Sequence, residues 1–138
     1  MRIDIANETE TVKKEFLQKN NFQSENAVDE KFIELNIFII SNKLYRQPNF
    51  SSADVGKMFL LSDRKIVELV LKNTNFGFKE YIIHIRVEKA KSYLKDAKYE
   101  NYTNLAIGFE CGFNSKSTFY RAFFKITDTN PTDFKSKT

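Results

Sequence analysis

The chain has 138 residues, 14% of them aromatic, with only 4 glycines and 2 prolines. This length suits one domain, or one domain with an arm, and the scarcity of glycine and proline argues against an all-β fold with many turns. With one Cys and one His, a disulfide framework is excluded and a Cys/His zinc site is strongly disfavoured, so we expect no cofactor and no metal. The formal net charge is +4.

The positive charge lies in the later part of the chain. Residues 51–138 carry 15 Lys/Arg and 10 Asp/Glu, whereas residues 1–50 carry 7 and 8. A basic half fits a polyanionic partner, although a solvated basic surface has the same composition. The sequence has no run of about 18 apolar residues and does not begin like a secretory signal, so we expect no membrane contact and a cytoplasmic location.

Residues 1–27 are polar and rich in Asn, Glu and Gln, and we interpret them as an N-terminal arm or the remnant of a linker. The next segment predicts a helix that Asp29 caps and that ends near Tyr45, because the residue before Pro48 avoids the helical region. Its apolar residues form a broad helical stripe. They are Phe32, Leu35, Ile39, Ile40 and Leu44, with Ile37 and Phe38 beside them.

Residues 51–74 predict two helices joined by a tight turn. Either Ser51 or Ser52 caps the first helix, and Ser62 caps the second. Asn75 ends this unit, because asparagine tolerates the left-handed conformation better than other non-glycine residues. The side chains expected to face inward are Val55, Met58 and Phe59 in the first helix and Ile66, Leu69 and Val70 in the second.

Residues 103–126 predict the same arrangement a second time. Here a short helix ends at Cys111, Gly112 supplies a left-handed residue, and Asn114 or Ser115 caps the next helix. The two arrangements form an internal repeat offset by about 53 residues, which points to a duplicated unit. In this repeat Gly56 corresponds to Gly108, Ser62 to Ser115, Ile66 to Phe119 and Val70 to Phe123, with one extra residue in the later turn.

Three further features complete the pattern. Phe119, Phe123 and Ile126 recur at helical spacing, so we expect them to be buried. Residues 78–97 predict one linking helix of about 20 residues, or about 30 Å. Asn130–Pro131 is typical of a helix start and predicts a last short helix.

The second unit resembles the DNA-binding domain of AraC/XylS-type transcription regulators. The family pattern there is I-A-x-x-x-G-F-x-S-x-S-x-F-x-R-x-F-K-K-x-x-G-x-T-P-x-x-Y/F-R/K, from which this chain departs at Gly108, Asp128 and Asn130. Matching residues are Ile107, Gly112, Phe113, Ser115, Ser117, Phe119, Arg121, Phe123, Lys125, Pro131 and Phe134. The family's linking-helix pattern is matched by Phe78, Tyr81, Ile82, Arg86, Ala90 and Leu94.

The resemblance covers about residues 30–137. It implies an all-α fold of about seven helices, with helix-turn-helix subdomains at about 51–74 and 103–126 joined by the linking helix. Residues 28–138 would form the DNA-binding domain of a sequence-specific transcription regulator that is not an enzyme and acts with RNA polymerase. Its two recognition helices would enter successive major grooves of double-stranded DNA, about 34–36 Å apart.

Carrying over the family's contacts gives candidate DNA-binding residues in both recognition helices. Arg121 either reads guanine or grips phosphate, Glu68 either accepts from cytosine N4 or repels phosphate, and Val67 fits a thymine methyl. Because Glu68 in the earlier helix can repel phosphate, we expect the later helix to bind DNA more tightly than the earlier one. The candidates are Arg64, Lys65, Val67 and Glu68 in the earlier helix, and Lys116, Ser117, Thr118, Tyr120, Arg121 and Lys125 in the later one.

Several alternatives stay open at this point. The fold also suits a protein-interaction module that uses the helix at 29–45, and the chain is either a complete short regulator or the DNA-binding output end of a longer sensor protein. It would bind as a monomer or as a dimer through a missing domain. His84 and Cys111 lack a catalytic partner at helical spacing, so we assign them structural or surface roles, and Arg86 a role in packing and pairing.

Overall fold

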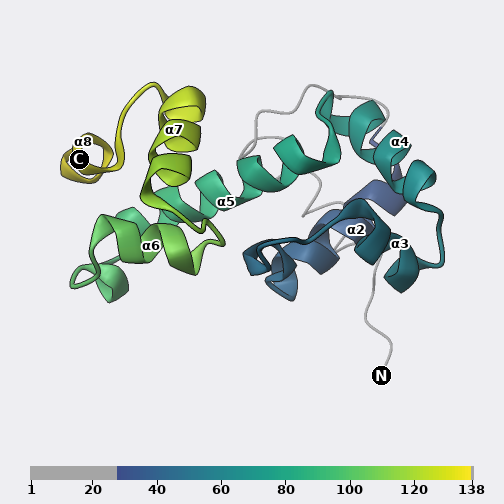
Figure 1. Ribbon diagram of the computed structural model, residues 1–138, viewed down its shortest axis with the longest axis horizontal. Coiled ribbons are helices and arrows are strands. Elements are labelled where there is room, and N and C mark those ends of the chain that lie inside the picture. Colours follow the sequence, from purple (N-terminus) through teal and green to yellow (C-terminus); the bar gives the residue numbers. More distant parts are fainter. Residues whose placement is uncertain (1–27, 138) are drawn as a thin grey trace. The chain divides into compact units, whose positions relative to one another are not determined.

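A computed structural model describes residues 28–137, so the predicted arm at 1–27 lies outside the described residues. Within them the chain forms seven α-helices, two short 3-10 helices and no strand, which confirms the all-α prediction (Figure 1). The α-helices are α2 (Glu30–Ser41), α3 (Ser52–Phe59), α4 (Asp63–Thr74), α5 (Phe78–Leu94), α6 (Asn104–Glu110), α7 (Lys116–Thr127) and α8 (Pro131–Ser136). The 3-10 helices are η1 (Leu44–Arg46) and η2 (Ala97–Tyr99).

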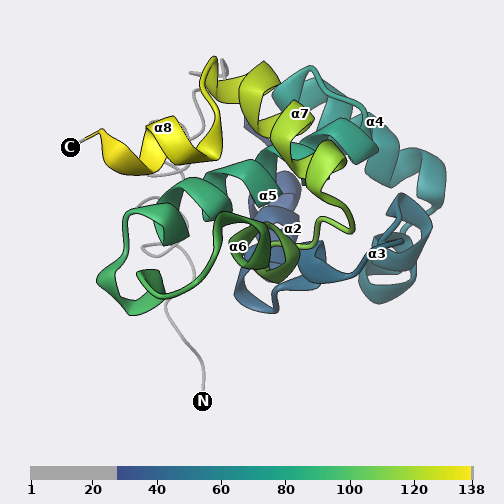
Figure 2. The same cartoon turned by 60° about the vertical axis from the view of Figure 1, so that its left-hand side comes forward.

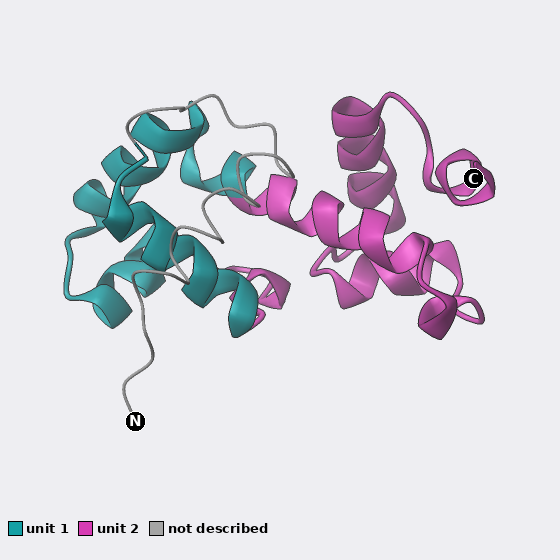
Figure 3. Ribbon diagram, turned by 180° about the vertical axis from the view of Figure 1, so that it is seen from behind, with its two compact units in different colours: residues 1–42, 51–81 teal, residues 43–50, 82–138 magenta. Residues whose placement is uncertain are grey.

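The described residues divide into two compact units (Figure 3). Residues 28–42 and 51–81 make unit 1, and residues 43–50 and 82–137 make unit 2. Each unit contains one pair of helices joined by a tight turn, α3 with α4 in unit 1 and α6 with α7 in unit 2. Helix α5 begins in unit 1 and continues into unit 2, so the linking segment is one helix of 17 residues.

The linking helix is shorter than the sequence predicts, because it ends at Leu94 rather than near residue 97. The chain turns at Lys95, and the Asp96 carboxylate accepts a hydrogen bond from the Lys98 backbone N–H at 2.9 Å. That bond starts the separate helix η2. At about 1.5 Å per residue, α5 is therefore about 25 Å long.

Unit 1 has a core of aliphatic and aromatic side chains, and one of its buried hydrogen bonds joins α5 to α2. The Tyr81 hydroxyl donates to Asn36 Oδ1 at 2.6 Å, which satisfies both buried groups. Burial raises the pKa of Tyr81 well above its usual value. The fully buried apolar side chains of the unit are Phe32, Leu35, Ile39, Val55, Ile66 and Val70.

Helix α2 begins after Asp29 as predicted, but its C-terminal end and the bonding of the Asp29 side chain differ from the prediction. It stops at Ser41 instead of continuing to Tyr45, because Lys43 adopts a left-handed conformation with φ 55° and Asn42 bonds back to the Phe38 carbonyl. Asp29 occupies the cap position, but its side chain makes no capping bond. Its carboxylate instead accepts from Asn73 Nδ2 and Lys72 Nζ, both at 3.2 Å, and these bonds from α4 lower the pKa of Asp29.

The expected inward side of α3 is also wrong at one position. Val55 is fully buried and Phe59 is half-buried, but Met58 is about half exposed. Successive helix residues point about 100° apart. Phe59 lies about 40° to one side of Val55 and Met58 about 60° to the other, so Met58 falls at the edge of the buried side and stays partly exposed.

Unit 2 contains α6, α7 and α8 (Figure 2), and its core is built around aromatic rings. Phe119 and Phe123 are fully buried, which confirms the predicted stripe, while Ile126 is only half-buried. The ring of Phe123 meets Phe119 edge-on at 5.8 Å and Phe134 of α8 at 5.5 Å between centroids. The other buried members of this core are Val87, Ala90, Leu94, Ile107, Cys111 and Phe113.

Arg86 has the packing and pairing role that the sequence predicts. Its Nε donates to the Tyr45 carbonyl at 2.7 Å and its Nη2 to the Gln47 carbonyl at 2.9 Å. These bonds tie the segment at 43–50 to α5, so the segment belongs to unit 2 although it precedes α3 in sequence. None of the helices within residues 28–137 has the length and apolar character needed to span a bilayer.

Candidate nucleic-acid interface

The turn of unit 1 is closed by caps and one short backbone contact. Ser51 begins α3 with a reciprocal capping box to Asp54, and Ser62 begins α4 by accepting from the Lys65 N–H at 3.1 Å. Between the helices the Leu61 N–H donates to the Gly56 carbonyl at 2.9 Å. A Cβ on Gly56 would lie 2.6 Å from the Leu61 carbonyl oxygen, so only glycine admits this turn.

The turn of unit 2 uses the same elements with one extra residue. Thr103 caps α6, and Ser115 rather than Asn114 caps α7 by accepting from the Thr118 N–H at 3.1 Å. The Phe113 N–H donates to the Gly108 carbonyl at 3.0 Å. These bonds make α6–α7 a second helix-turn-helix unit equivalent to α3–α4.

Two glycines shape the second turn. A Cβ on Gly108 would lie 2.5 Å from the Phe119 ring, so this glycine lets α7 pack closely on α6. Gly112 has φ +106°, a left-handed conformation that side chains disfavour, and a Cβ there would meet the Tyr45 carbonyl oxygen at 2.5 Å.

Helix α7 presents one exposed face. At about 100° per residue, Ser117, Arg121 and Lys125 project from the side opposite the buried Phe119 and Phe123. A large apolar side chain, Phe124, lies among them and is 57% exposed. This face therefore combines two cations, one hydroxyl and one aromatic ring.

Three predicted residues of α7 lie at the edges of that face or have internal partners. The Thr118 hydroxyl accepts from Ser115 Oγ at 2.8 Å, and Tyr120 is half-buried with its ring edge-on to Phe119. Lys116 is exposed, and its Nζ lies 5.4 Å from the centre of the Tyr120 ring. Thr118 and Tyr120 thus have less reach than Arg121.

Helix α4 presents the equivalent face with a different charge pattern. Arg64 and Glu68 are exposed and form an ion pair, with Arg64 Nε 3.3 Å from Glu68 Oε1. Lys72 lies on the same face and pairs with Asp29. Leu71, which lies between Glu68 and Lys72 along the helix, is 52% exposed. Lys65 and Val67 are exposed at either edge. The cations of this face are thus partly compensated by acidic neighbours.

All ten predicted residues therefore lie on α4 or α7, and eight of them are exposed. The structure adds Leu71 and Phe124, which the sequence analysis did not select. The sequence did contain a signal for both residues. Leu71 follows Glu68 by three residues, as Phe124 follows Arg121. The family pattern has lysine at Phe124, which is a departure in addition to Gly108, Asp128 and Asn130.

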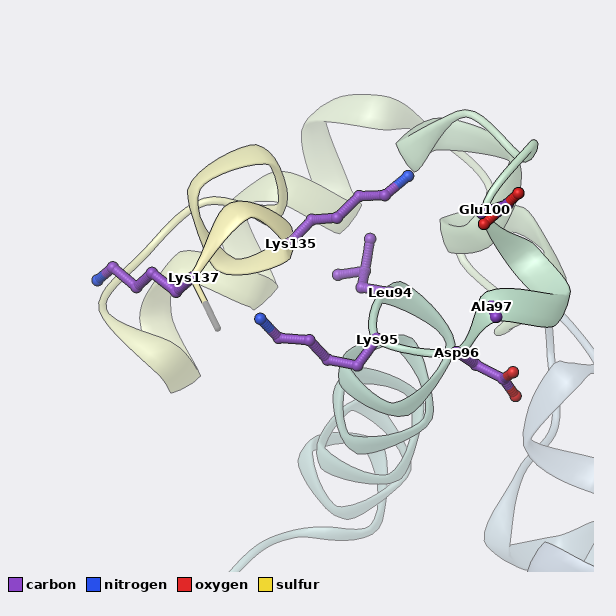
Figure 4. A pocket seen from close by; sticks show the side chains of 7 residues that line it. All are labelled: Leu94, Lys95, Asp96, Ala97, Glu100, Lys135 and Lys137. Carbon is purple, nitrogen blue, oxygen red and sulfur yellow. The ribbon is translucent and has the colours of Figure 1, made fainter.

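Unit 2 also has open pockets, and one of about 320 Å³ is lined by Arg46, Tyr102, Ala106, Phe109 and Glu110. An open pocket of about 400 Å³ lies between the end of α5 and α8, where Lys95, Lys135 and Lys137 are mixed with Asp96 and Glu100 (Figure 4). Such mixed charge is typical of a solvated surface. Among the described residues, no three His, Cys, Asp or Glu side chains are grouped to hold a metal ion.

Cys111 and His84, the two side chains considered as catalytic candidates, lie in positions that suit a structural role. Cys111 is fully buried, and burial raises the pKa of its thiol to about 12, so the reactive thiolate is suppressed. His84 is half-buried within α5. Both positions agree with the structural roles that the sequence suggests.

Comparisons with known proteins agree with this geometry. A family model described as a helix-turn-helix domain matches residues 55–137. An uncharacterized HTH-type transcriptional regulator, YijO of Escherichia coli, is 32% identical over 83 residues, which are 59% of this chain and 28% of that relative. The chain thus spans less than a third of the length of this curated relative.

Two solved structures share the fold at 23% identity. One is the C-terminal domain of the two-component response regulator yesN from Fusobacterium nucleatum, with a TM-score of 0.62 over 75% of this chain and 97% of that chain. The other is a protein of unknown function from Listeria innocua, with a TM-score of 0.58 over 72% and 91%. At this identity the two structures support the fold alone.

Proposed function

The chain belongs to the AraC-type helix-turn-helix domain family of DNA-binding transcription regulators, and from this premise we propose that it binds a specific double-stranded site through α4 and α7. In this proposal each helix enters a major groove, and the two grooves are successive turns of one duplex, about 34–36 Å apart. Residues 28–138 form the DNA-binding domain, and α5 connects the two helix-turn-helix units.

The observation that carries the proposal is the equivalence of the two exposed helices. Each has 12 residues, begins at a serine cap after a glycine-dependent turn, and buries one apolar side. A major groove about 12 Å wide accepts a helix of this kind, and the exposed hydroxyl, amino and guanidinium groups are donors that suit phosphates and base edges.

Within this proposal the later helix supplies most of the binding. Arg121 and Lys125 are exposed cations on one face, with Ser117 beside them as a hydrogen-bonding group. Arg121 either forms two hydrogen bonds to guanine or grips a phosphate. Lys116, Thr118 and Tyr120 contact the rim of the groove, because two of them are half-buried and Lys116 lies over Tyr120.

The earlier helix binds more weakly in this proposal. Arg64 and Lys65 approach DNA, while Glu68 restrains Arg64 through their ion pair and carries a charge that phosphate repels. Val67 at the edge of the face contacts a thymine methyl group. We further propose that the protein acts in the cytoplasm, has no catalytic activity, contacts RNA polymerase, and binds as a monomer or as a dimer through a domain outside this chain.

A salt titration of DNA binding tests the proposal. Duplexes are first selected from a random pool with the purified chain, and the binding constant is then measured by fluorescence anisotropy between 50 and 200 mM salt. Each phosphate contact should contribute about −0.9 to the slope of log K against log salt concentration. The double variant Arg64→Ala, Arg121→Ala should show a shallower slope.

The competing function is a protein-interaction module that uses the exposed side of α2. If no duplex binds at about 50 mM salt while the chain remains folded by circular dichroism, the DNA-binding proposal is wrong. A variant that alters exposed residues of α2, such as Lys31→Ala, serves as the control and should leave DNA binding unchanged.

A further inference from the structure

Both proposed recognition helices expose a large apolar side chain at the same position. Leu71 is the ninth residue of α4 and Phe124 the ninth residue of α7, and both helices have 12 residues. The two side chains are 52% and 57% exposed. A single exposed apolar residue needs no explanation, but a repeated one at equivalent positions of duplicated units points to a shared role.

Neither side chain is needed by its own core. Helix α7 already fills its unit with Phe119 and Phe123, and α4 does the same with Ile66 and Val70. Phe124 is adjacent to the buried Phe123 in sequence but points to the exposed side, where Arg121 and Lys125 also project. The apolar group is thus placed within a polar, DNA-facing surface.

We propose that Leu71 and Phe124 contact the C5 methyl groups of thymines, one in each major groove. This inference rests on the proposed function. The thymine methyl is the apolar group that the standard bases present in the major groove, so an exposed apolar side chain on a recognition helix discriminates in its favour. Phe124 lies three residues beyond Arg121, or about 4.5 Å further along the helix axis, within reach of neighbouring bases in the same groove.

The two contacts differ in size and so in strength. Phe124 presents an aromatic ring, whereas Leu71 presents a branched aliphatic group of smaller area. The thymine preference is therefore stronger in the half-site bound by α7. Each contact adds sequence specificity and no charge. It therefore differs from the phosphate contacts of neighbouring lysine and arginine side chains, which carry no sequence information directly.

Replacing single thymines by deoxyuridine provides the test, because deoxyuridine pairs identically and lacks only the methyl group. Duplexes selected by the unaltered chain carry one deoxyuridine at a time, and binding constants are measured at fixed salt. At about 0.8 kcal/mol for one fully buried methyl group, we expect replacement of one thymine in each half-site to lower the affinity by up to about fourfold, with the larger loss in the half-site bound by α7.

Variants then assign each methyl group to a side chain. Phe124→Ala should abolish the deoxyuridine effect in one half-site and Leu71→Ala in the other, with an unchanged slope of log K against log salt concentration. Phe124→Leu should retain most of the effect, because it remains apolar. The matched controls are Phe109→Ala on α6 and Met58→Ala on α3, which are exposed to a similar degree outside the recognition helices.

The outcomes separate this inference from the proposed function. Failure of the unaltered chain to select any duplex would overturn the proposed function and with it the thymine contacts. Selection of duplexes that tolerate deoxyuridine everywhere, or a Phe124→Ala variant that keeps the full deoxyuridine effect in both half-sites, would overturn the thymine contacts alone. A Phe124→Ala variant with unaltered DNA binding but lost self-association would show that a second protein chain uses this face instead.

Discussion

The two helix-turn-helix units reach the same backbone turn with different side chains. In unit 1 the Leu61 N–H bonds to the Gly56 carbonyl at 2.9 Å, and in unit 2 the Phe113 N–H bonds to the Gly108 carbonyl at 3.0 Å. Gly56 is required because backbone approaches it, whereas Gly108 is required because the Phe119 ring does. Both units therefore need a glycine at the same position of the turn, but the atoms that exclude a larger residue differ between the two units.

The units also differ in how they position their exposed charges. In α4, Arg64 pairs with Glu68 and Lys72 pairs with Asp29. In α7, neither Arg121 nor Lys125 has an acidic partner within 4.0 Å among the described residues. The same scaffold therefore presents exposed cations with acidic partners in one unit and, among the described residues, exposed cations without such partners in the other.

The largest change that we expect is a loss of folding stability when the aromatic core of unit 2 is altered. Phe123→Ala should cost about 3–5 kcal/mol of unfolding free energy, because a buried ring is removed and a cavity remains. The equivalent Val70→Ala in unit 1 should cost about 2 kcal/mol, since it deletes only two buried carbon groups. Urea denaturation measures both. A change below about 1 kcal/mol for Phe123→Ala, as expected for the exposed neighbour in Phe124→Ala, would contradict the burial of Phe123.

The second effect concerns the left-handed residues of the two turns. Gly112→Ala should destabilise unit 2 by about 2–4 kcal/mol, because the new Cβ combines an unfavourable φ with a close approach to the Tyr45 carbonyl. Leu60 in unit 1 has φ 56° and is 92% exposed, so Leu60→Gly should stabilise that unit by about 0.5–1 kcal/mol. Thermal unfolding of both variants shows whether each substitution lowers or raises the stability. Two shifts in the same direction would mean that the turns do not differ in strain.

The third effect concerns DNA binding by the two arginines. Arg121→Ala should weaken binding to a selected duplex by about 1–3 kcal/mol if Arg121 contacts a base with two hydrogen bonds. Arg64→Ala should weaken it less, because the nearby Glu68 carboxylate offsets part of the attraction between Arg64 and phosphate. Binding constants at two salt concentrations compare the variants. The opposite order would make α4 the main reader, with Glu68 accepting a hydrogen bond from a cytosine amino group.

A smaller effect is expected when the charge pattern of α4 is made more like that of α7. Glu68→Arg removes the acidic partner of Arg64 and adds a cation at the position equivalent to Arg121. Non-specific binding should tighten, and the slope of log K against log salt concentration should steepen by up to about 0.9, the value for one phosphate contact. Glu68→Gln is the matched control, since it removes the charge without adding a cation. Weaker binding by Glu68→Arg would show that the carboxylate itself contacts DNA.

The last effect is the contribution of Cys111 in unit 2 to the pH dependence of stability, which is absent near neutral pH. The pKa of Cys111 is raised to about 12 by burial, against about 8.5 for an unperturbed thiol. Because the folded pKa is the higher one, the stabilising contribution is complete below about pH 8.5 and is lost as pH rises toward 12. Between those values Cys111→Ala should lose less stability than the unaltered chain in urea denaturation at each pH. Equal losses would mean that the thiol is not shielded from solvent.

Much of this protein could be predicted from local sequence. Serine caps, the left-handed Gly112 and Asn75, and the spacing of Phe119 and Phe123 depend on neighbours within one or two helical turns, so they determine the helices and their buried sides. The candidate contacts on α4 and α7 came instead from the resemblance to the AraC/XylS-type pattern. Local rules failed at Lys43, where a non-glycine residue adopts φ 55° and ends α2 four residues before the predicted end at Tyr45.

Other features depended on contacts between residues far apart in sequence. Asp29 bonds to Lys72 and Asn73 instead of capping α2, and Arg86 binds the carbonyl groups of Tyr45 and Gln47, which assigns residues 43–50 to unit 2. No periodicity indicates which remote carboxylate or carbonyl a side chain will meet, because such pairs form only when the helices pack. The exposure of Leu71 and Phe124 was likewise decided by packing, since an apolar residue becomes a surface group only after its neighbours have filled the core.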